Sequence, residues 1–292
     1  MSDKSDQGYV IEDMPEGRTL IVTGRWSDAA EVAVQQPDVD GIWLNYARGY
    51  CEPDLSFLDA WPIRRLLVLD RTVTDLEPLS RLGQTLEELS FQAAPGTGVD
   101  LGALPRLREV AGAWDEVRET LYAPEFLQRL ILFDYDESDL QPLNVQPSLQ
   151  KIQLKVAPKL ETLDGIASFP TLAELRIAAA RELHDLVELT SAASTLRSLD
   201  FEACLDIYDI EALSELAELR YLGISECGRI PSLLAVGELS LLECLYAWGT
   251  TRIEDSDLSP LLRLSHLSEI RMRDRREYRP PLADVKEQLG CA

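Results

Sequence analysis

Apolar residues recur along the chain in one register, apolar-x-x-apolar-x-apolar. The clearest copies begin at Ile63, Leu86, Leu127, Leu149, Leu172, Leu196, Leu219, Leu242 and Leu267. Weaker copies begin at Val39 and Leu107. From Leu149 to Leu242 the copies are 23, 24, 23 and 23 residues apart. The alternation predicts a short strand in each copy, and the period predicts a repeat architecture in which each unit stacks on the next.

A second motif accompanies the first: an Asp, then an apolar residue, then Leu three residues after that. It begins at Asp54, Asp75, Asp100, Asp139, Asp185, Asp209 and Asp257. An Asp directly before an apolar i, i+3 pair is typical of the N-cap of a short helical turn. Each repeat is therefore predicted to contain a short strand, a tight turn and one or two helical turns that lead back.

These two motifs resemble those of the leucine-rich repeat family in its short form, with repeats of roughly 22–24 residues. The resemblance covers about residues 39–275. It implies an α/β fold, a right-handed solenoid or horseshoe with a parallel sheet on the concave face and short helical segments on the convex face.

The chain departs from the family where an Asn usually bonds the turn backbone. That position holds Arg71, Asp115, Tyr135, Ala157, Ala180, Cys204, Cys227 and Thr250. Because Ala cannot make such a bond, we expect water or altered turns to satisfy the turn amides. The repeat spacing shrinks to 20 or 21 residues near residues 94–126, so we expect an irregular solenoid there.

Both ends of the chain carry segments suited to cover the apolar ends of a solenoid. Residues 1–38 are predicted to form an N-terminal cap, with two strands around a turn at 14–17 and a short helix at 28–36. Residues 276–292 are predicted to form a C-terminal cap with a helix at 281–289. About 11 repeats lie between them, over 39–275. The alternative is a separate function for residues 1–38.

The chain of 292 residues has a formal net charge of −23, which narrows the class of partner. An acidic chain lacks the basic surface that neutralises phosphates, so neither nucleic acid nor a membrane is an expected partner, whereas a basic protein is. We expect no secretory signal and no transmembrane segment. The five widely spaced cysteines favour reduced thiols in a cytoplasmic protein. Only five of the 28 basic residues are Lys, a bias compatible with a GC-rich bacterial genome.

No arrangement of side chains in the sequence predicts catalysis. His184 and His266 have no accompanying nucleophile or paired carboxylate, and the motifs of phosphate loops, zinc proteases and serine hydrolases are missing. We therefore expect no enzyme activity, no cofactor and no metal. Cys204 and Cys227 occupy one position in successive repeats and are expected to stack. Buried thiols are the first interpretation of this pair, and a redox switch is the second.

Side chains alternate along a strand, so the third, fifth and seventh positions of each copy point outward on the concave face, followed by a turn residue. The predicted protein-binding residues at these positions are Trp43, Tyr46, Leu69, Trp114, Ile131, Phe133, Asp200, Glu202, Tyr221, Tyr246 and Trp248. A solvated sheet has no packing use for exposed aromatic side chains, whereas binding surfaces are rich in them.

The first functional hypothesis is a monomeric, non-enzymatic module that binds a basic protein through its concave face. Its sharper form is an inhibitor or immunity-type protein for a basic enzyme or toxin. This form rests on analogy with acidic nuclease inhibitors of the family, whose repeats are longer. Two alternatives stay open. One is a surface-displayed adhesion protein. The other is a regulatory subunit of an enzyme, because regulators of small GTPases share the family's fold.

Overall fold

The computed structural model describes residues 8–291, and the chain divides into two compact units, residues 1–131 and 132–292. The strands of unit 1 are β1 (Tyr9–Met14), β2 (Gly17–Val22), β3 (Gly41–Asn45), β4 (Arg65–Leu69), β5 (Glu88–Gln92) and β6 (Glu109–Ala113). They neighbour one another in chain order, β1 antiparallel to β2 and every later pair parallel. Residues 1–7 of the predicted N-terminal cap lie outside the described residues.

Unit 2 continues the same pattern, after β7 (Arg129–Phe133), which spans the boundary. Its main strands are β8 (Lys151–Leu154), β9 (Glu174–Ala178), β10 (Ser198–Glu202), β11 (Tyr221–Ser225), β13 (Cys244–Ala247) and β15 (Glu269–Met272), all parallel. The short strands β12 (Arg229–Ile230) and β14 (Arg252–Ile253) form a separate pair. Leu199 lies opposite Leu175 and Leu222, so the predicted repeat register is confirmed in unit 2.

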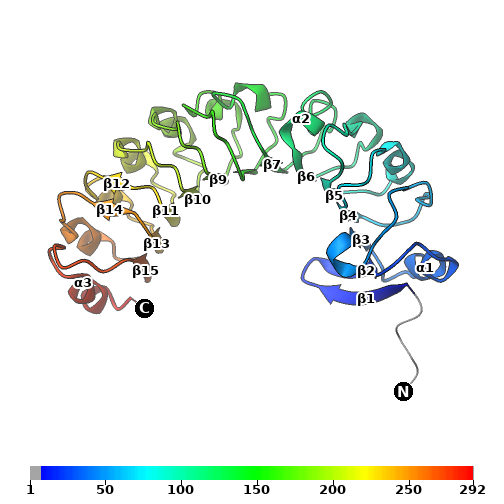
Figure 1. Ribbon diagram of the computed structural model, residues 1–292. Coiled ribbons are helices and arrows are strands. Elements are labelled where there is room, and N and C mark those ends of the chain that lie inside the picture. The colour runs from blue at the N-terminus through cyan, green and yellow to red at the C-terminus, as the bar shows by residue number, and fades with distance from the viewer. Residues whose placement is uncertain (1–7, 292) are drawn as a thin grey trace, which may run out of the picture. The chain divides into compact units, whose positions relative to one another are not determined.

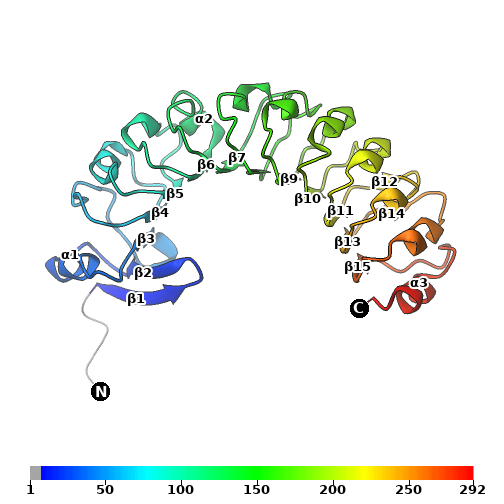
Figure 2. The same ribbon diagram turned by 180° about the vertical axis from the view of Figure 1, so that it is seen from behind.

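The return path of most repeats is a short 3₁₀ helix. These segments are η1 (Tyr46–Arg48), η2 (Glu77–Leu82), η3 (Leu101–Ala103), η4 (Gln141–Leu143), η5 (Ile166–Ser168), η6 (Val187–Ala192), η7 (Glu211–Glu215), η8 (Val236–Glu238) and η9 (Ser259–Arg263). The α-helices are α1 (Asp28–Val34), α2 (Trp114–Val117) and α3 (Leu282–Leu289). Within each unit the strands lie on the inner side of the curve and the helical segments on the outer side (Figures 1 and 2).

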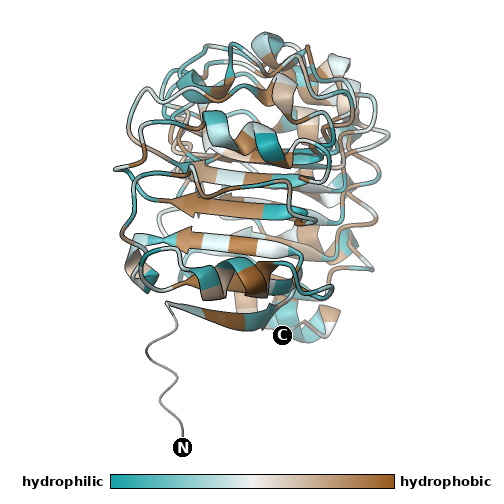
Figure 3. Ribbon diagram, turned by 90° about the vertical axis from the view of Figure 1, so that its right-hand side faces the viewer, coloured by the Kyte–Doolittle hydropathy of each residue, from teal (hydrophilic) through white to brown (hydrophobic). Residues whose placement is uncertain are grey.

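The apolar residues of the repeated register form the core between the strands and the helical segments. Leu199 and Phe201 of β10 are fully buried, as is Leu213 of η7 on the opposite side of the same repeat. In Figure 3 the visible strands are largely brown, and much of the teal lies in the loops. Burial of these apolar side chains is the main source of stability in a solenoid whose repeats contact chiefly their neighbours.

The seven Asp residues of the second motif all bond a local turn, but the predicted N-cap position is confirmed only for Asp100, before η3. Before η2, η4, η6, η7 and η9 the N-cap is the residue after the Asp, and no helical segment follows Asp54 among the described residues. In all seven motifs a side-chain oxygen of the Asp accepts a hydrogen bond from the backbone N–H two residues later, at 2.7 to 2.9 Å. Bonds to Ser56 and Ser259 hold the pKa values of Asp54 and Asp257 below their usual range. Part of the acidic excess of the chain therefore serves its fold.

The turn after each strand satisfies its backbone without the Asn of the related family. Ala179, Ala203 and Glu226 have left-handed backbones, with φ of 54°, 56° and 57°. Their N–H groups donate to carbonyl oxygens of the following repeat, at 2.8, 3.0 and 3.0 Å. In these three turns the backbone of the next repeat satisfies the N–H groups.

Side chains at the family's Asn position bond back to the preceding strand. The thiols of Cys204 and Cys227 donate to the carbonyls of Ile177 and Phe201, at 3.5 and 3.3 Å. In the next repeat the register predicts Thr250 at the Asn position. This prediction is wrong, because Thr250 is exposed and Thr251 is buried in its place. The loop holds one more residue here, which moves the buried position along by one.

The Thr251 hydroxyl makes two hydrogen bonds to the preceding repeat. It donates to the Ile224 carbonyl at 2.5 Å and accepts a bond from the Cys227 N–H at 3.0 Å. Both partner groups are buried, so the hydroxyl joins two successive repeats where water does not reach.

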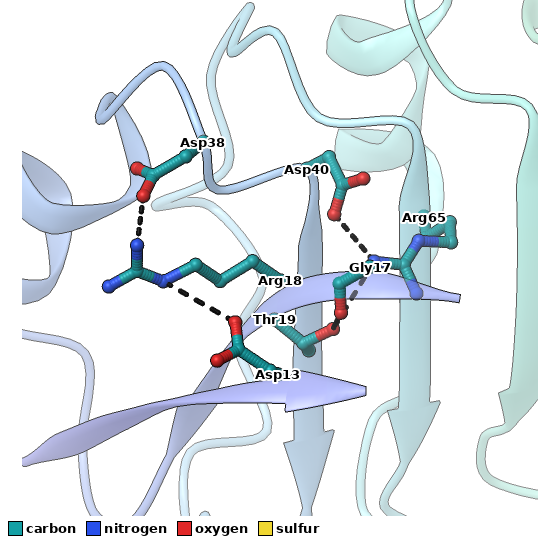
Figure 4. A network of polar contacts seen from close by, with 7 residues as sticks. All are labelled: Asp13, Gly17, Arg18, Thr19, Asp38, Asp40 and Arg65. Carbon is teal, nitrogen blue, oxygen red and sulfur yellow. Dashed lines mark hydrogen bonds and ion pairs between the residues drawn. The ribbon is translucent and has the colours of Figure 1, made fainter. Parts of the chain in front are cut away.

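The elements predicted at both ends are present. β1 and β2 form the hairpin, α1 begins after the Ser27 N-cap, and α3 ends at the left-handed Gly290. Ion pairs and hydrogen bonds connect the hairpin to its neighbours, as Figure 4 shows. Arg18 of β2 contacts Asp13 and Asp38, and Arg65 of β4 contacts Asp40 and the Thr19 hydroxyl. The division into caps and solenoid itself stays a prediction.

The irregular segment predicted near 94–126 contains a buried acid. The return path after β6 begins with α2, an α-helix rather than a 3₁₀ turn. Glu116 of α2 is buried, and its carboxylate accepts hydrogen bonds from the backbone of Gly96 and Ala113. Burial, and then the neighbouring Asp115 charge, raise the pKa of Glu116 to about 7.

This raised pKa predicts a loss of stability as pH rises. The unfolded chain releases the Glu116 proton near pH 4.5 and the folded chain near pH 7, so the folded state binds the proton more tightly across this window. Between pH 5 and pH 8, we expect the free energy of unfolding of wild type to fall by on the order of 1 to 2 kcal/mol more than that of Glu116→Gln. Urea unfolding at both pH values measures this difference. Parallel pH profiles for the two proteins would contradict it.

Candidate functional site

The outward side chains of the strands in unit 2 form three rows, which we call the strand face of unit 2. The first row is Lys151, Glu174, Ser198, Tyr221, Cys244 and Glu269. The second is Gln153, Arg176, Asp200, Gly223, Tyr246 and Arg271. The third is Ala178, Glu202 and Ser225, and the same position in the other repeats is held by Phe133, Lys155, Trp248 and Arg273. Parallel pairing in register places each residue beside its neighbours in the row.

Tyrosines lie at the centre of this face. The rings of Tyr221 and Tyr246 meet edge to face, with centroids 5.1 Å apart. The Arg271 guanidinium lies over the Tyr246 ring at 4.9 Å and forms an ion pair with Glu269 at 2.6 Å. A hydrogen bond to Glu269 raises the pKa of Tyr246. The chain's own contacts therefore hold this aromatic pair in place.

Trp248 is the most exposed aromatic residue of this face, at 59%. It follows β13 and borders a groove of about 470 Å³ that is also lined by Ser225, Tyr246, Arg271 and Met272. The groove is open to solvent and combines aromatic walls with a cationic side. A large side chain of a partner could be received here, with Trp248 contributing apolar area.

Two predicted carboxylates stand beside the tyrosines. Asp200 is half-buried on β10, and Glu202 is exposed at the end of the same strand. Burial raises the pKa of Asp200, Arg176 partly opposes that rise, and Glu202 adds to it. Among the described residues, no basic group lies within ion-pair distance of either carboxylate.

Because its charged form is disfavoured, Asp200 should not stabilise the fold at neutral pH. A folded-state pKa above the unfolded value means that its contribution to stability is lost as pH rises through the folded pKa. We expect Asp200→Asn to match or exceed the wild-type melting temperature at pH 7, by about 0 to 3 °C, with a smaller difference at pH 3.5. Thermal unfolding at both pH values tests this. A clear fall in melting temperature at pH 7 would show a structural role instead.

The strand face of unit 1 has its own groove. Its volume is about 330 Å³, and its lining includes Trp43, Leu67, Arg65 and Ser90. The Arg48 guanidinium lies over the Trp43 ring at 5.5 Å. Among the described residues the buried indole N–H of Trp43 has no hydrogen-bond acceptor. This groove is a second concave surface that a side chain could enter.

The remaining predicted residues divide into outward and buried ones. Tyr46 is exposed, and Leu69, Ile131 and Phe133 are half-buried at outward positions. The expectation that Trp114 faces outward is wrong, because only 3% of its surface is exposed. The chain passes directly from β6 into α2 with Trp114 as the first helical residue, so the strand alternation stops before it.

Some features of these surfaces were not found by sequence reasoning. Gly223 looks unremarkable in the sequence, yet it is the outward residue between Asp200 and Tyr246. On the outer side of unit 2, Tyr208 and Leu234 are 62% and 56% exposed and line one shallow groove. Tyr208 and Leu234 could have been noticed as large apolar residues in loops, for which the repeat register predicts neither burial nor exposure.

The titratable groups of the described residues offer no candidate metal centre. Within residues 8–291, no group of three or more His, Cys, Asp and Glu side chains could hold a metal ion. Cys204 and Cys227 are both buried and free, and they contact each other as expected. Their mutual hydrogen bond, and burial, raise the pKa of the Cys227 thiol. In the same part of the chain, no helix is long and apolar enough to cross a bilayer.

Comparison with solved structures decides the fold. An internalin, InlF from Listeria monocytogenes, matches 72% of this chain and 67% of its own, with a TM-score of 0.50 and 22% identity. The structure of the TLR13–ssRNA13 complex matches 82% of this chain and 36% of the TLR13 chain, with a TM-score of 0.55 and 18% identity. The chain has the leucine-rich repeat fold. This likeness establishes the fold alone; no protein-family model and no curated protein matches the sequence.

Proposed function

We propose that this leucine-rich repeat chain is a non-enzymatic protein-interaction module that binds a basic protein through the strand face of unit 2. The observation that carries this proposal is the exposed Trp248 beside a tyrosine pair and two carboxylates without ion-pair partners. Aromatic anchors next to complementary charge are the features from which interfaces draw most of their binding energy.

The charge of the chain supports a basic partner. A net charge of −23 attracts a cationic protein over distances comparable to the Debye length and accelerates encounter. The seven capping Asp residues account for part of that charge, but Asp200 and Glu202 lie on the strand face and do not cap turns. They supply local attraction where the aromatic anchors lie.

Affinity capture from the lysate of the native cell, followed by mass spectrometry, tests the proposal. The baits are wild type, a strand-face variant (Tyr221→Ala/Trp248→Ala) and a matched outer-side variant (Tyr208→Ala/Leu234→Ala). We expect a basic protein that the wild type and the outer-side variant retain and the strand-face variant loses. Retention by all three baits, or loss by the outer-side variant alone, would contradict a strand-face site.

A sharper form of the proposal is that binding inhibits the partner, as an immunity-type protein inhibits a toxin or enzyme. The acidity of the chain favours this form over a neutral scaffold, because it fits a partner whose own task requires basic surface. Activity of the captured protein with and without one equivalent of the chain decides between inhibition and scaffolding. We also propose a cytoplasmic monomer, which sedimentation at micromolar concentration tests.

A further inference from the structure

Aromatic rings on the strand faces are paired with cations from the chain itself. The pairs are Arg48 over Trp43 at 5.5 Å, Lys155 over Phe133 at 5.0 Å and Arg271 over Tyr246 at 4.9 Å. Among the described residues no cation lies over the ring of Trp248, and none lies over that of Tyr221. The Tyr221 ring instead meets Tyr246 edge to face.

Carboxylates on the strand face of unit 2 show the same contrast. Glu174 forms ion pairs with Lys151 at 3.1 Å and Arg176 at 2.9 Å, and Glu269 is paired with Arg271. Within the described part of the chain Asp200 has no ion-pair partner, like Glu202, and it lies beside Tyr221, since it contributes to the raised pKa of Tyr221.

Gly223 determines how these groups lie. In the sheet it is the register partner of both Asp200 and Tyr246. A Cβ at Gly223 would overlap the Asp200 carboxylate and lie 3.4 Å from Cε1 of Tyr221. The carboxylate thus lies in the notch that the missing side chain leaves, beside the Tyr221 ring. We call Asp200, Tyr221, Gly223 and Tyr246 the Asp200 notch.

This arrangement is unfavourable for Asp200 in the free protein. Burial raises its pKa, and the charges of Glu202 and Glu174 raise it further, while Arg176, which is engaged with Glu174, lowers it. A cation brought to the notch would relieve the desolvated carboxylate and could stack on the tyrosine ring at the same time.

We propose that the Asp200 notch receives an arginine side chain of the basic partner, an inference that rests on the proposed function above. Arginine suits the notch better than lysine for two reasons. Its planar guanidinium can donate two parallel hydrogen bonds to a carboxylate, and it stacks on an aromatic face while doing so. A lysine ammonium offers a point charge and no plane to stack.

Titration of the full chain with a single arginine tests this assignment. The probes are N-acetyl-arginine amide, the uncharged isostere N-acetyl-citrulline amide, and N-acetyl-lysine amide. The observed signals are those of ¹³C-labelled tyrosine rings, with Tyr221 assigned through Tyr221→Phe. We expect the arginine probe to shift the Tyr221 signal saturably, with an affinity on the order of 10 mM that is usual for so small a ligand. Lysine should bind several-fold more weakly, and citrulline should not bind.

Three variants separate the notch from general electrostatics. Asp200→Asn should weaken arginine binding by at least about fivefold. Gly223→Ala should also weaken it, because one methyl group displaces the carboxylate while the backbone of this strand accommodates Ala. Glu215→Gln removes the same charge on η7 and should leave binding unchanged. Equal binding of citrulline or lysine, or an unchanged affinity in Asp200→Asn, would overturn the proposal.

Failure of this inference is distinguishable from failure of the proposed function. If arginine does not bind but the strand-face variant still loses its partner in the capture experiment, the strand face is the interface and the notch is not its arginine site. If the arginine probe binds as expected and Asp200→Asn captures as much partner as wild type, the notch does not receive the partner's arginine.

Discussion

Replacing Tyr221 and Trp248 together by Ala is expected to weaken binding of the captured basic protein by at least about 100-fold. Aromatic anchors at the centre of an interface each contribute about 2 kcal/mol or more, and about 2.8 kcal/mol corresponds to a 100-fold change in Kd. Trp248 is exposed and Tyr221 is only half-buried, so the free protein loses little when both are removed. Titration calorimetry or surface binding with purified partner measures the change.

The matched control removes two large side chains from the outer side of the same unit. Tyr208→Ala/Leu234→Ala deletes a comparable exposed area without touching the strand face. It should change the affinity by less than about threefold, in line with surface substitutions outside an interface. A strand-face variant that binds within threefold of wild type, with its circular dichroism unchanged, would show that these side chains are not the anchors.

The second large effect concerns the fold. Thr251→Val keeps the shape of the side chain but removes the hydroxyl that serves Ile224 and Cys227. Each of those two backbone groups is then buried without this hydrogen-bond partner, which destabilises the fold by about 1 to 3 kcal/mol per group. We expect the free energy of unfolding to fall by about 2 to 4 kcal/mol. Urea unfolding would show this as a lower midpoint with an unchanged slope.

Thr250→Val is the control one residue earlier. Thr250 is exposed, so water can replace the hydrogen bond that its hydroxyl makes with Glu226. We therefore expect the free energy of unfolding to fall by less than about 1 kcal/mol. If the two variants are equally stable, the buried bond between repeats is not what holds this turn.

The repeat itself could be predicted from the sequence, because its information is periodic. Leu175, Leu199 and Leu222 meet in the sheet as their spacing indicates, and the Asp of each second motif bonds its turn. Positions one residue away from the period could not be predicted. The move from Thr250 to Thr251 depends on one extra loop residue between two copies, and the register alone does not say where a loop accommodates it.

The candidate site could be predicted only in part, for a similar reason. Strand alternation correctly points Tyr221 and Tyr246 outward, but it does not apply to Trp114, where the chain leaves the strand and starts a helix. Nor does a pattern of residue types show that the Asp200 carboxylate lies over Gly223, since these residues are 23 positions apart in the sequence. Such relations depend on the pairing of strands in space.

The most direct test of a strand-face interface is site-specific photo-crosslinking in the native cell. A benzoylphenylalanine in place of Tyr221 reports on the strand face, and the same group in place of Tyr208 reports on the outer side of the unit. We expect a crosslinked adduct to one basic protein from position 221 and none from position 208. An adduct from position 208 alone, or an adduct from position 221 only to acidic proteins, would contradict it.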